Sequence, residues 1–155
     1  MTALNREGRA MKRQLVDVNV LFAPVWPRHE NHGAAHAWFS ATASRAWATS
    51  PLTQLGVLRL LTNPAVARDA VSAASALAIV NEATGHGGHA FWMVDESTVA
   101  GLRSYALRLR GHQQWTDAVL LRQAADHDGL LVTFDKSVKE LAGQTQARVL
   151  LLSRG

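Results

Sequence analysis

Short apolar runs that alternate with helical patterns constrain the fold of this chain more than any other feature of its sequence. The runs lie at 15–18, 47–49, 90–94, 130–134 and 149–152. In length and residue content they are typical of β-strands. Strands separated by helices predict a parallel sheet covered on both faces, so we expect an α/β fold with three layers, α/β/α.

The stretches between the apolar runs carry helix signals. Ser50 and Pro51 mark a helix start, and an apolar face is expected from Leu52, Leu55, Leu58 and Leu61. Further helices are expected at 29–42, 68–83, 99–109, 116–126 and 137–141, the last with a capping box from Ser137 to Glu140. Residues 18–26 should make only a turn of helix, because Pro24 and Pro27 stop it.

Length and composition bound the class of protein. The chain has 155 residues, which fits one domain, and no cysteine, which excludes disulfides and cysteine nucleophiles and favours a reducing, cytoplasmic setting. No apolar run reaches the ~20 residues that span a bilayer, and Asp17 interrupts a signal-peptide pattern, so no membrane partner is expected. The formal net charge of +4 agrees with a polyanionic partner without identifying one.

Residues 1–10 are polar and show no periodicity, and Met11 follows them. We therefore expect either a flexible N-terminal extension or a translation start at Met11, with the domain occupying residues 11–155. A stable product in the native cell that begins at Met11 would support the second interpretation.

Three acidic residues are expected at one edge of the sheet. Asp17 follows the apolar pair Leu15-Val16, Asp135 follows the fourth run, and Asp117 lies in the first turn of the helix that leads to the fourth run. Ligands of parallel α/β sheets bind beyond the carboxyl ends of the strands, so these three carboxylates are placed to converge.

Converging carboxylates repel one another unless a proton or a cation lies between them. Oxygen ligands without cysteine suit Mg²⁺ or Mn²⁺, and such an ion favours hydrolysis of a phosphate ester. The competing interpretation is that each acid is a helix N-cap. Asp17 fits this interpretation best, because Ser137 and Thr116 offer alternative caps beside Asp135 and Asp117.

Four segments occur in order within residues 14–141: LVDVNVLFAPVWPRHENHGAAHAWF, WATSPLTQLGVLRLLTNP, WTDAVLL and LVTFD. With these segments the chain resembles the PIN-domain ribonucleases, specifically the VapC-type toxins of bacterial toxin–antitoxin pairs. The resemblance implies a PIN fold with a central parallel sheet and an endoribonuclease that depends on Mg²⁺ or Mn²⁺. It also implies a homodimer and neutralisation by a small cognate antitoxin.

The resemblance further implies roles for individual residues. Asp17, Asp117 and Asp135 match the acids that hold the metal and carry catalysis, and Asn19 and Thr133 match the polar positions that flank them.

One position departs from the family pattern. The family usually has a Glu on the helix after the second strand, where this chain has Gln54, so weaker metal binding or loss of a second metal is expected. By analogy with the family, water attacks the phosphorus in line and the 3′ oxygen leaves, which gives 5′-phosphate and 3′-hydroxyl ends.

A basic and aromatic segment lies just before Asp117. Its residues Arg110, His112 and Trp115 are candidates for RNA binding, with arginine on phosphate and the ring stacked on an unpaired base. A solvated loop with one packing Trp explains them equally well. Arg59 and Lys136 are weaker phosphate candidates.

Other polar residues have simpler interpretations. Asp95 follows the third run and is a reserve metal ligand, although an ordinary turn explains it better. His29, His32 and His36 share one side of a helix, but their spacing fails HExxH, so we expect surface or interface histidines and not zinc ligands.

The main alternative function is a catalytically weak or inactive PIN-like module that binds RNA or a protein, because Gln54 replaces the usual acid. Trp38, Phe39, Leu58 and Leu61 would build its interface, although core packing explains these residues equally well. An upstream reading frame for a DNA-binding antitoxin would favour the toxin. The sequence leaves open the RNA target, the cleavage sequence and the antitoxin.

Overall fold

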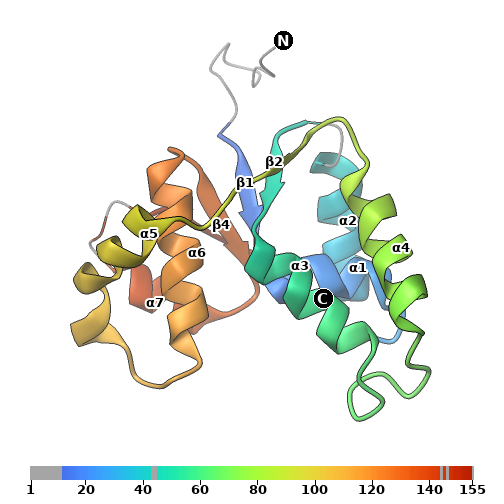
Figure 1. The fold of residues 1–155 in the computed structure, drawn as a ribbon. Helices are drawn as coiled ribbons and strands as arrows, with labels where there is room; N and C mark the ends of the chain where they lie inside the picture. Colours follow the sequence, from blue (N-terminus) through green and yellow to red (C-terminus); the bar gives the residue numbers. More distant parts are fainter. Residues whose placement is uncertain (1–11, 43–44, 144, 146, 155) are drawn as a thin grey trace.

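The computed structural model describes residues 12–42, 45–143, 145 and 147–154, and within them a five-stranded parallel sheet forms the middle of the molecule (Figure 1). Its strands are β1 (Gln14–Val16), β2 (Trp47–Thr49), β3 (His89–Phe91), β4 (Leu130–Thr133) and β5 (Val149–Leu151). Their order is β3-β2-β1-β4-β5, and each neighbouring pair is parallel. The carboxyl ends of β1 and β4 lie side by side, because Val16 pairs with Val132.

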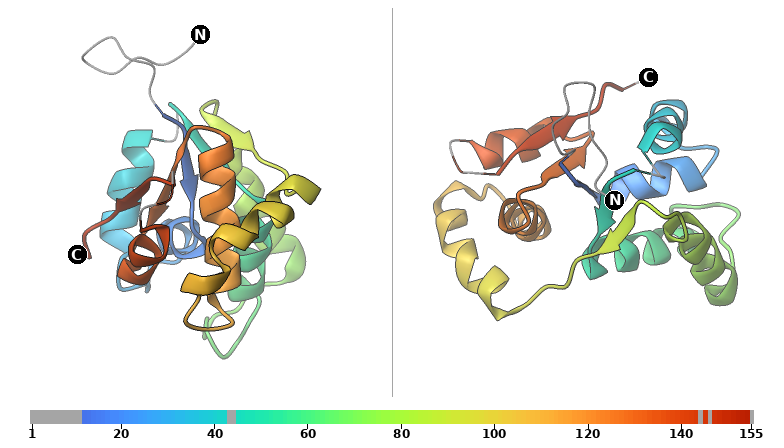
Figure 2. Two further views of the ribbon diagram at one scale, coloured as in Figure 1. Left: turned by 90° about the vertical axis from the view of Figure 1, so that its left-hand side faces the viewer. Right: turned by 90° about the horizontal axis from the view of Figure 1, so that it is seen from above.

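Helices cover both faces of the sheet. One face carries α1 (Val18–Val25), α2 (His32–Thr42), α3 (Pro51–Leu61) and α4 (Ala73–Thr84), and the other carries α5 (Glu96–Ala100), α6 (Gln114–Asp126) and α7 (Lys136–Ala142) (Figures 1 and 2). Strand side chains alternate between the two cores: Val16 and Trp47 pack with α1–α4, whereas Leu15 and Leu131 pack with α6 and α7. The expected α/β fold, with three layers α/β/α around a parallel sheet, is confirmed.

Two expectations concern the chain as a whole. The extension expected at residues 1–10 and the alternative start expected at Met11 lie outside the described residues. Within those residues, no helix is both long and apolar enough to cross a membrane.

Helices α1 and α2 differ in length from the expectation. Helix α1 continues through Pro24 to Val25, because a proline in the last turn removes only one backbone donor from the helix. Helix α2 begins at His32 and not at residue 29. The imidazole Nδ1 of His29 accepts from the backbone N–H of Asn31 (3.0 Å), and this local turn competes with helix formation.

Helix α3 begins as expected but buries a different face. Ser50 is the N-cap, with Pro51 as the first helical residue. The core side consists of Thr53, Val57 and Leu61, while the side chain of Leu55 is 57% exposed. A leucine at every third position drifts around a helix of 3.6 residues per turn, so one leucine of the expected face points to solvent.

The segments around β3 also differ. Helix α4 begins at Ala73 and not at residue 68, because Ser72 caps it, and β3 ends at Phe91 and not at residue 94. The helix expected at 99–109 is absent: α5 ends at Ala100 and two 3₁₀ turns follow, Gly101–Ser104 and Ala106–Arg108. A Cβ at residue 101 would lie 2.5 Å from Nε of Arg122, so this segment packs closely on α6.

Candidate metal centre

Asp17 lies between β1 and α1 and joins the sheet to the helix. Its carboxylate Oδ1 accepts from the backbone N–H of Val18 (2.7 Å), and its Oδ2 accepts from the hydroxyl of Thr133 (2.8 Å). The side chain is the N-cap of α1, as the capping interpretation allowed. Burial raises the pKa of Asp17 against the lowering effect of these two hydrogen bonds, and the nearby charge of Asp135 raises it further.

Asp135 lies at the same edge, just beyond β4. Its backbone N–H donates to the hydroxyl oxygen of Thr133 (3.0 Å), so Thr133 contacts both Asp17 and Asp135. The Asp135 carboxylate Oδ1 accepts from the backbone N–H of Ser137 (2.8 Å) and caps α7. The expected cap at Ser137 is therefore wrong. A carboxylate oxygen has two lone pairs, so capping leaves acceptor capacity for a second ligand.

Asp117 faces this edge from the first turn of α6. The helix begins at Gln114, two residues before the expected Thr116, and no side chain caps it. Burial and the negative charges of Asp17 and Asp135 raise the pKa of Asp117 to about 7. Carboxylates from three separate elements thus act on one another electrostatically at the carboxyl edge of the sheet.

The donor chemistry of this edge suits a hard divalent cation, because the three acids and Thr133 offer only oxygen atoms. In the part of the chain that the structure describes, no three His, Cys, Asp or Glu side chains are already assembled as a metal-binding group. Burial and repulsion by Asp17 and Asp135 both raise the pKa of Asp117, and a divalent cation would relieve the repulsion.

Gln54 is held by a neighbouring strand. Its amide Nε2 donates to the hydroxyl of Thr49 (2.9 Å), and that hydroxyl also hydrogen-bonds Nε2 of His89 (2.8 Å). Burial and the charge of Arg13 lower the pKa of His89, which favours a neutral ring that accepts from Thr49. Sequence analysis missed Thr49 and His89. Thr49 ends β2, so the rule that selected Asp17 and Asp135 also selects Thr49.

Asn19 is exposed, in the first turn of α1, two residues from Asp17. Asp95 caps α5 with both halves of a capping box, which agrees with its ordinary interpretation. On α2, His32 hydrogen-bonds the carbonyl oxygen of Ala23 (2.7 Å), and the ring of His36 lies against that of His32.

Four of the candidate RNA-binding residues lie near the starts of α6 and α7, and the fifth lies on α3, on the other face of the sheet. Arg110, His112 and Trp115 lie at or just before the start of α6; all three are exposed, and Arg110 pairs with Glu140 on α7 (3.5 Å). Lys136 is the exposed first residue of α7. Arg59 is exposed on α3.

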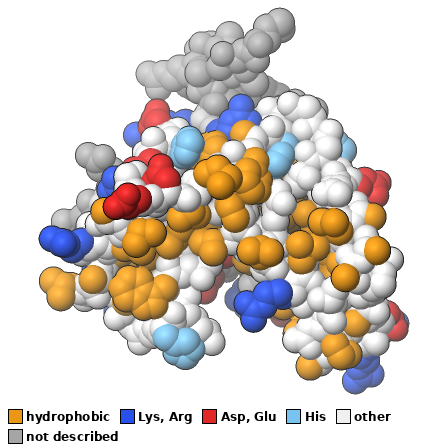
Figure 3. Space-filling model, in the orientation of Figure 1, with side chains coloured by type: hydrophobic (Ala, Val, Ile, Leu, Met, Phe, Trp, Pro, Cys, Tyr) orange, Lys and Arg blue, Asp and Glu red, His pale blue; other side chains and the backbone are white. Residues whose placement is uncertain are grey.

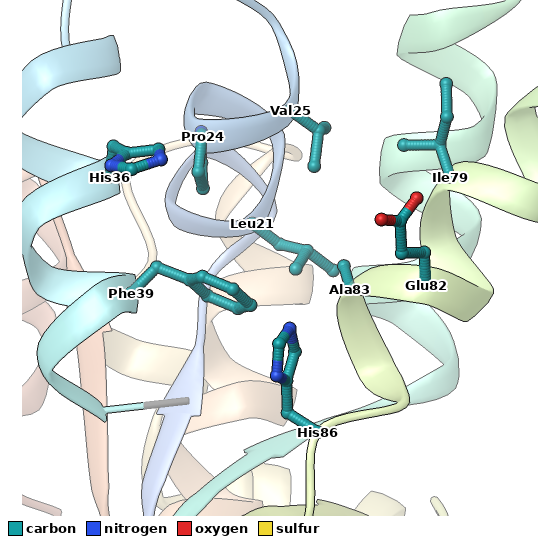
Figure 4. Close-up of a pocket in the computed structure, with 9 residues that line it drawn as sticks. All are labelled: Leu21, Pro24, Val25, His36, Phe39, Ile79, Glu82, Ala83 and His86. Carbon is teal, nitrogen blue, oxygen red and sulfur yellow. The ribbon is translucent and has the colours of Figure 1, made fainter. Parts of the chain in front are cut away.

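The surface is hollowed in two places that bear on function. Figure 3 shows a notch between helices α5–α7 and helices α1–α4. Acidic atoms lie inside the notch, and a Lys or Arg side chain lies at its rim. A separate, mostly apolar hollow of about 280 Å³ lies among α1, α2 and α4, where Leu21, Phe39 and His86 point into it beside Glu82 (Figure 4).

Comparisons with known proteins agree with this architecture. A family model described as PIN domain matches residues 15–144. Ribonuclease VapC39 of Mycobacterium tuberculosis (strain ATCC 25618 / H37Rv) is 37% identical over 136 residues, covering 88% of this chain and 98% of the relative. Ribonuclease VapC38 of the same strain is 40% identical over 130 residues, covering 84% of this chain and 90% of the relative.

Two solved structures have a similar fold. VapBC2 from Rickettsia felis, bound to a DNA fragment from its promoter, has a TM-score of 0.59 at 12% identity and covers 90% of this chain and 98% of its own. FitAB bound to an IR36 DNA fragment has a TM-score of 0.57 at 21% identity and covers 89% of this chain and 94% of its own.

Proposed function

We propose, from the premise that this chain belongs to the PIN-domain family and to its VapC-type ribonucleases, that it cleaves RNA with a divalent ion held by Asp17, Asp117 and Asp135. The ion is Mg²⁺ or Mn²⁺, which oxygen donors suit. The domain occupies residues 11–155. In this proposal the protein is the toxin of a toxin–antitoxin pair, and a cognate antitoxin neutralises it.

The observation that carries the proposal is the electrostatic coupling of the three acids. Asp17 and Asp135 share Thr133, and burial together with the charges of these two acids raises the pKa of Asp117 to about 7. Structural carboxylates usually have a cation or a hydrogen-bond donor beside them, whereas grouped carboxylates with a raised pKa are typical of functional sites.

The chain's own residues prepare the site for phosphodiester hydrolysis. Thr133 and the N–H of Val18 fix the two oxygens of Asp17, and the N–H of Ser137 fixes one oxygen of Asp135. Because its pKa is about 7, Asp117 is partly protonated near neutral pH and would release its proton on binding the ion. A bound divalent ion supplies a more acidic water and neutralises charge on the scissile phosphate. In-line attack of water leaves 5′-phosphate and 3′-hydroxyl ends.

The test is cleavage of a structured RNA by the purified full chain with Mg²⁺, with Mn²⁺ and with EDTA. We expect cleavage only with a metal ion, and at least ~100-fold slower cleavage by Asp17→Asn and Asp117→Asn. Asp69→Asn is the matched control, because Asp69 is exposed and pairs only with Arg28 among the described residues (3.5 Å). Wild-type rates in folded Asp17→Asn and Asp117→Asn proteins would refute the proposal.

The second candidate, a module that binds without cutting, is favoured by Gln54, whose amide already donates to Thr49. The same assay separates the two functions, because a binding module retains RNA and leaves it intact with either metal ion.

An antitoxin partner is supported by the relatives and by the surface. The similar structures are named for two-component assemblies, VapBC2 and FitAB. Of the four residues proposed for an interface, Leu61 lies in the core, while Trp38, Phe39 and Leu58 are partly buried. Phe39 lines the apolar hollow of Figure 4, which can accept an apolar side chain of a partner.

A further inference from the structure

A further hollow lies between α1 and α3, and Val18, the neighbour of Asp17, is one of its lining residues. Its volume is about 570 Å³, within the ~300–1,000 Å³ typical of small-ligand sites. Its lining includes Val18, Gly56, Arg59, Leu60, Thr62 and Asn63.

One wall of this hollow is continuous with the candidate metal centre. Val18 lines the hollow, and its backbone N–H donates to Oδ1 of Asp17. Gly56 brings α3 close to α1 at this wall, since a Cβ at residue 56 would lie 2.6 Å from Cγ2 of Val18. Arg59 lies three residues further along α3, about 5 Å along the helix axis. The lining of the hollow therefore extends from the neighbour of Asp17 to Arg59.

The far end of the hollow offers hydrogen-bond donors. Arg59 is exposed, and within the described part of the chain no carboxylate lies at salt-bridge distance from it. The Oδ1 of Asn63 accepts from the backbone N–H of Ala65 (3.0 Å), which leaves the amide Nδ2 of Asn63 to donate elsewhere. A guanidinium and an amide donor that line one hollow suit the oxygens of a phosphate.

The walls between the acids and Arg59 are apolar. Val18 and Leu60 are partly buried and line the hollow on the α1 and α3 sides. An apolar surface beside a phosphate-binding group matches a nucleotide, whose ribose and base carry apolar surface and whose phosphate carries charge.

We propose that this hollow is a subsite for a nucleotide that flanks the cleaved bond of single-stranded RNA, and that Arg59 binds the phosphate of that nucleotide. The proposal rests on the ribonuclease function proposed above and assigns the path of the strand away from the acids. The subsite reads the backbone of an unpaired strand, so it adds affinity without selecting a base.

The experiment measures binding of a short fluorescent single-stranded RNA of random sequence to the full chain in EDTA, by anisotropy over a series of salt concentrations. We expect Arg59→Gln to weaken binding about threefold to tenfold and to reduce the slope of log K against log salt by about 0.7, the share of one phosphate. Arg59→Lys should retain most of the affinity, because it keeps the charge. Arg148→Gln is the matched control, since Arg148 is exposed at the opposite end of the sheet, just before β5.

Two results would overturn the subsite. One is an affinity and salt slope for Arg59→Gln equal to those of Arg148→Gln. The other is that Arg59→Gln lowers the affinity for polyglutamate and the affinity for RNA by the same factor, which would mean that Arg59 binds acidic protein surfaces. Neither result touches the ribonuclease proposal, which is tested separately by metal-dependent cleavage in the wild type and by its loss in Asp17→Asn and Asp117→Asn.

Discussion

Thr133 shows how one side chain organises the proposed centre at the scale of single residues. Its hydroxyl donates to Asp17 and accepts from the N–H of Asp135, so a single oxygen fixes the relative positions of two acids from different strands. The sequence marked Thr133 only as a flanking polar position. Its bridging role depends on β1 and β4 being neighbours, which a one-dimensional pattern does not contain.

Asp117 should make stability depend on pH. Its pKa is about 7 in the folded chain, against 3.8 for an ordinary Asp, so the folded state holds a proton that the unfolded state has lost. The free energy of unfolding therefore falls as pH rises from about 4 to 7. In Asp117→Asn this fall is absent, so the stability of the variant relative to the wild type should rise by about 1–3 kcal/mol between pH ~5 and pH ~8.

Urea unfolding of both proteins in EDTA measures this difference. Parallel pH profiles for the wild type and Asp117→Asn would contradict the raised pKa.

Gln54→Glu should strengthen metal binding. An added carboxylate at the position where the family usually has Glu increases the attraction for a divalent ion, and we expect Mn²⁺ affinity to rise about threefold to tenfold by calorimetry. Glu cannot donate to Thr49 as the Gln54 amide does, so a stability loss of about 1 kcal/mol is expected as well. Gln54→Met is the control that removes the oxygen. If Gln54→Glu and the wild type give the same metal titration, residue 54 does not belong to the site.

At the scale of elements, sequence patterns located the strands better than the helix ends. Both β2 and the start of α3 were predicted correctly, because Ser50 and Pro51 give a local signal. The helix at 99–109 was wrong, since close packing of Gly101 against Arg122 is a tertiary effect. The cap of α7 was also wrong, because Ser137 and Asp135 compete for one role and only geometry decides between them.

The contact between α1 and α3 should be sensitive to one methyl group. In Gly56→Ala the new Cβ meets the stiff side chain of Val18 at 2.6 Å, so we expect a loss of about 1–2 kcal/mol despite the better helix propensity of Ala. In a Val18→Ala background the clash disappears, and Gly56→Ala should then be neutral or stabilising. Thermal unfolding of the four proteins gives this cycle, and strictly additive effects would contradict the close approach.

At the scale of the whole molecule, strand order creates the candidate centre. The order β3-β2-β1-β4-β5 places β1 and β4 next to each other, so Asp17 and Asp135 lie side by side although 118 positions separate them. The sequence predicted that strand ends would face one edge. It did not predict which strands are neighbours, because pairing depends on contacts between distant segments.

The same strand order leaves β3 at one edge of the sheet, and we propose that a second copy of the chain covers it. Phe91 and Met93 at this edge are 47% and 64% exposed, and hydrophobic side chains gather over β3, α3 and α4 (Figure 3). Exposed edges and apolar patches of this kind favour association. We expect a dimer in light scattering for the wild type and a monomer for Met93→Lys.

Leu107→Lys is the control for the dimer, because Leu107 is fully exposed and lies outside this patch. A monomeric wild type would contradict this assignment of the interface. So would a Met93→Lys protein that dimerises with the same affinity as the wild type.

The central claim is that Asp17, Asp117 and Asp135 jointly bind one divalent cation. The most direct measurement is an anomalous difference map from crystals of the full chain grown with Mn²⁺. We expect a strong peak at the carboxyl edge of β1 and β4, with a carboxylate oxygen of each of the three residues at roughly 2 Å from it. Mn²⁺ peaks that lie only elsewhere would contradict joint binding by the three acids. So would a peak at this edge that no more than one of these carboxylates contacts.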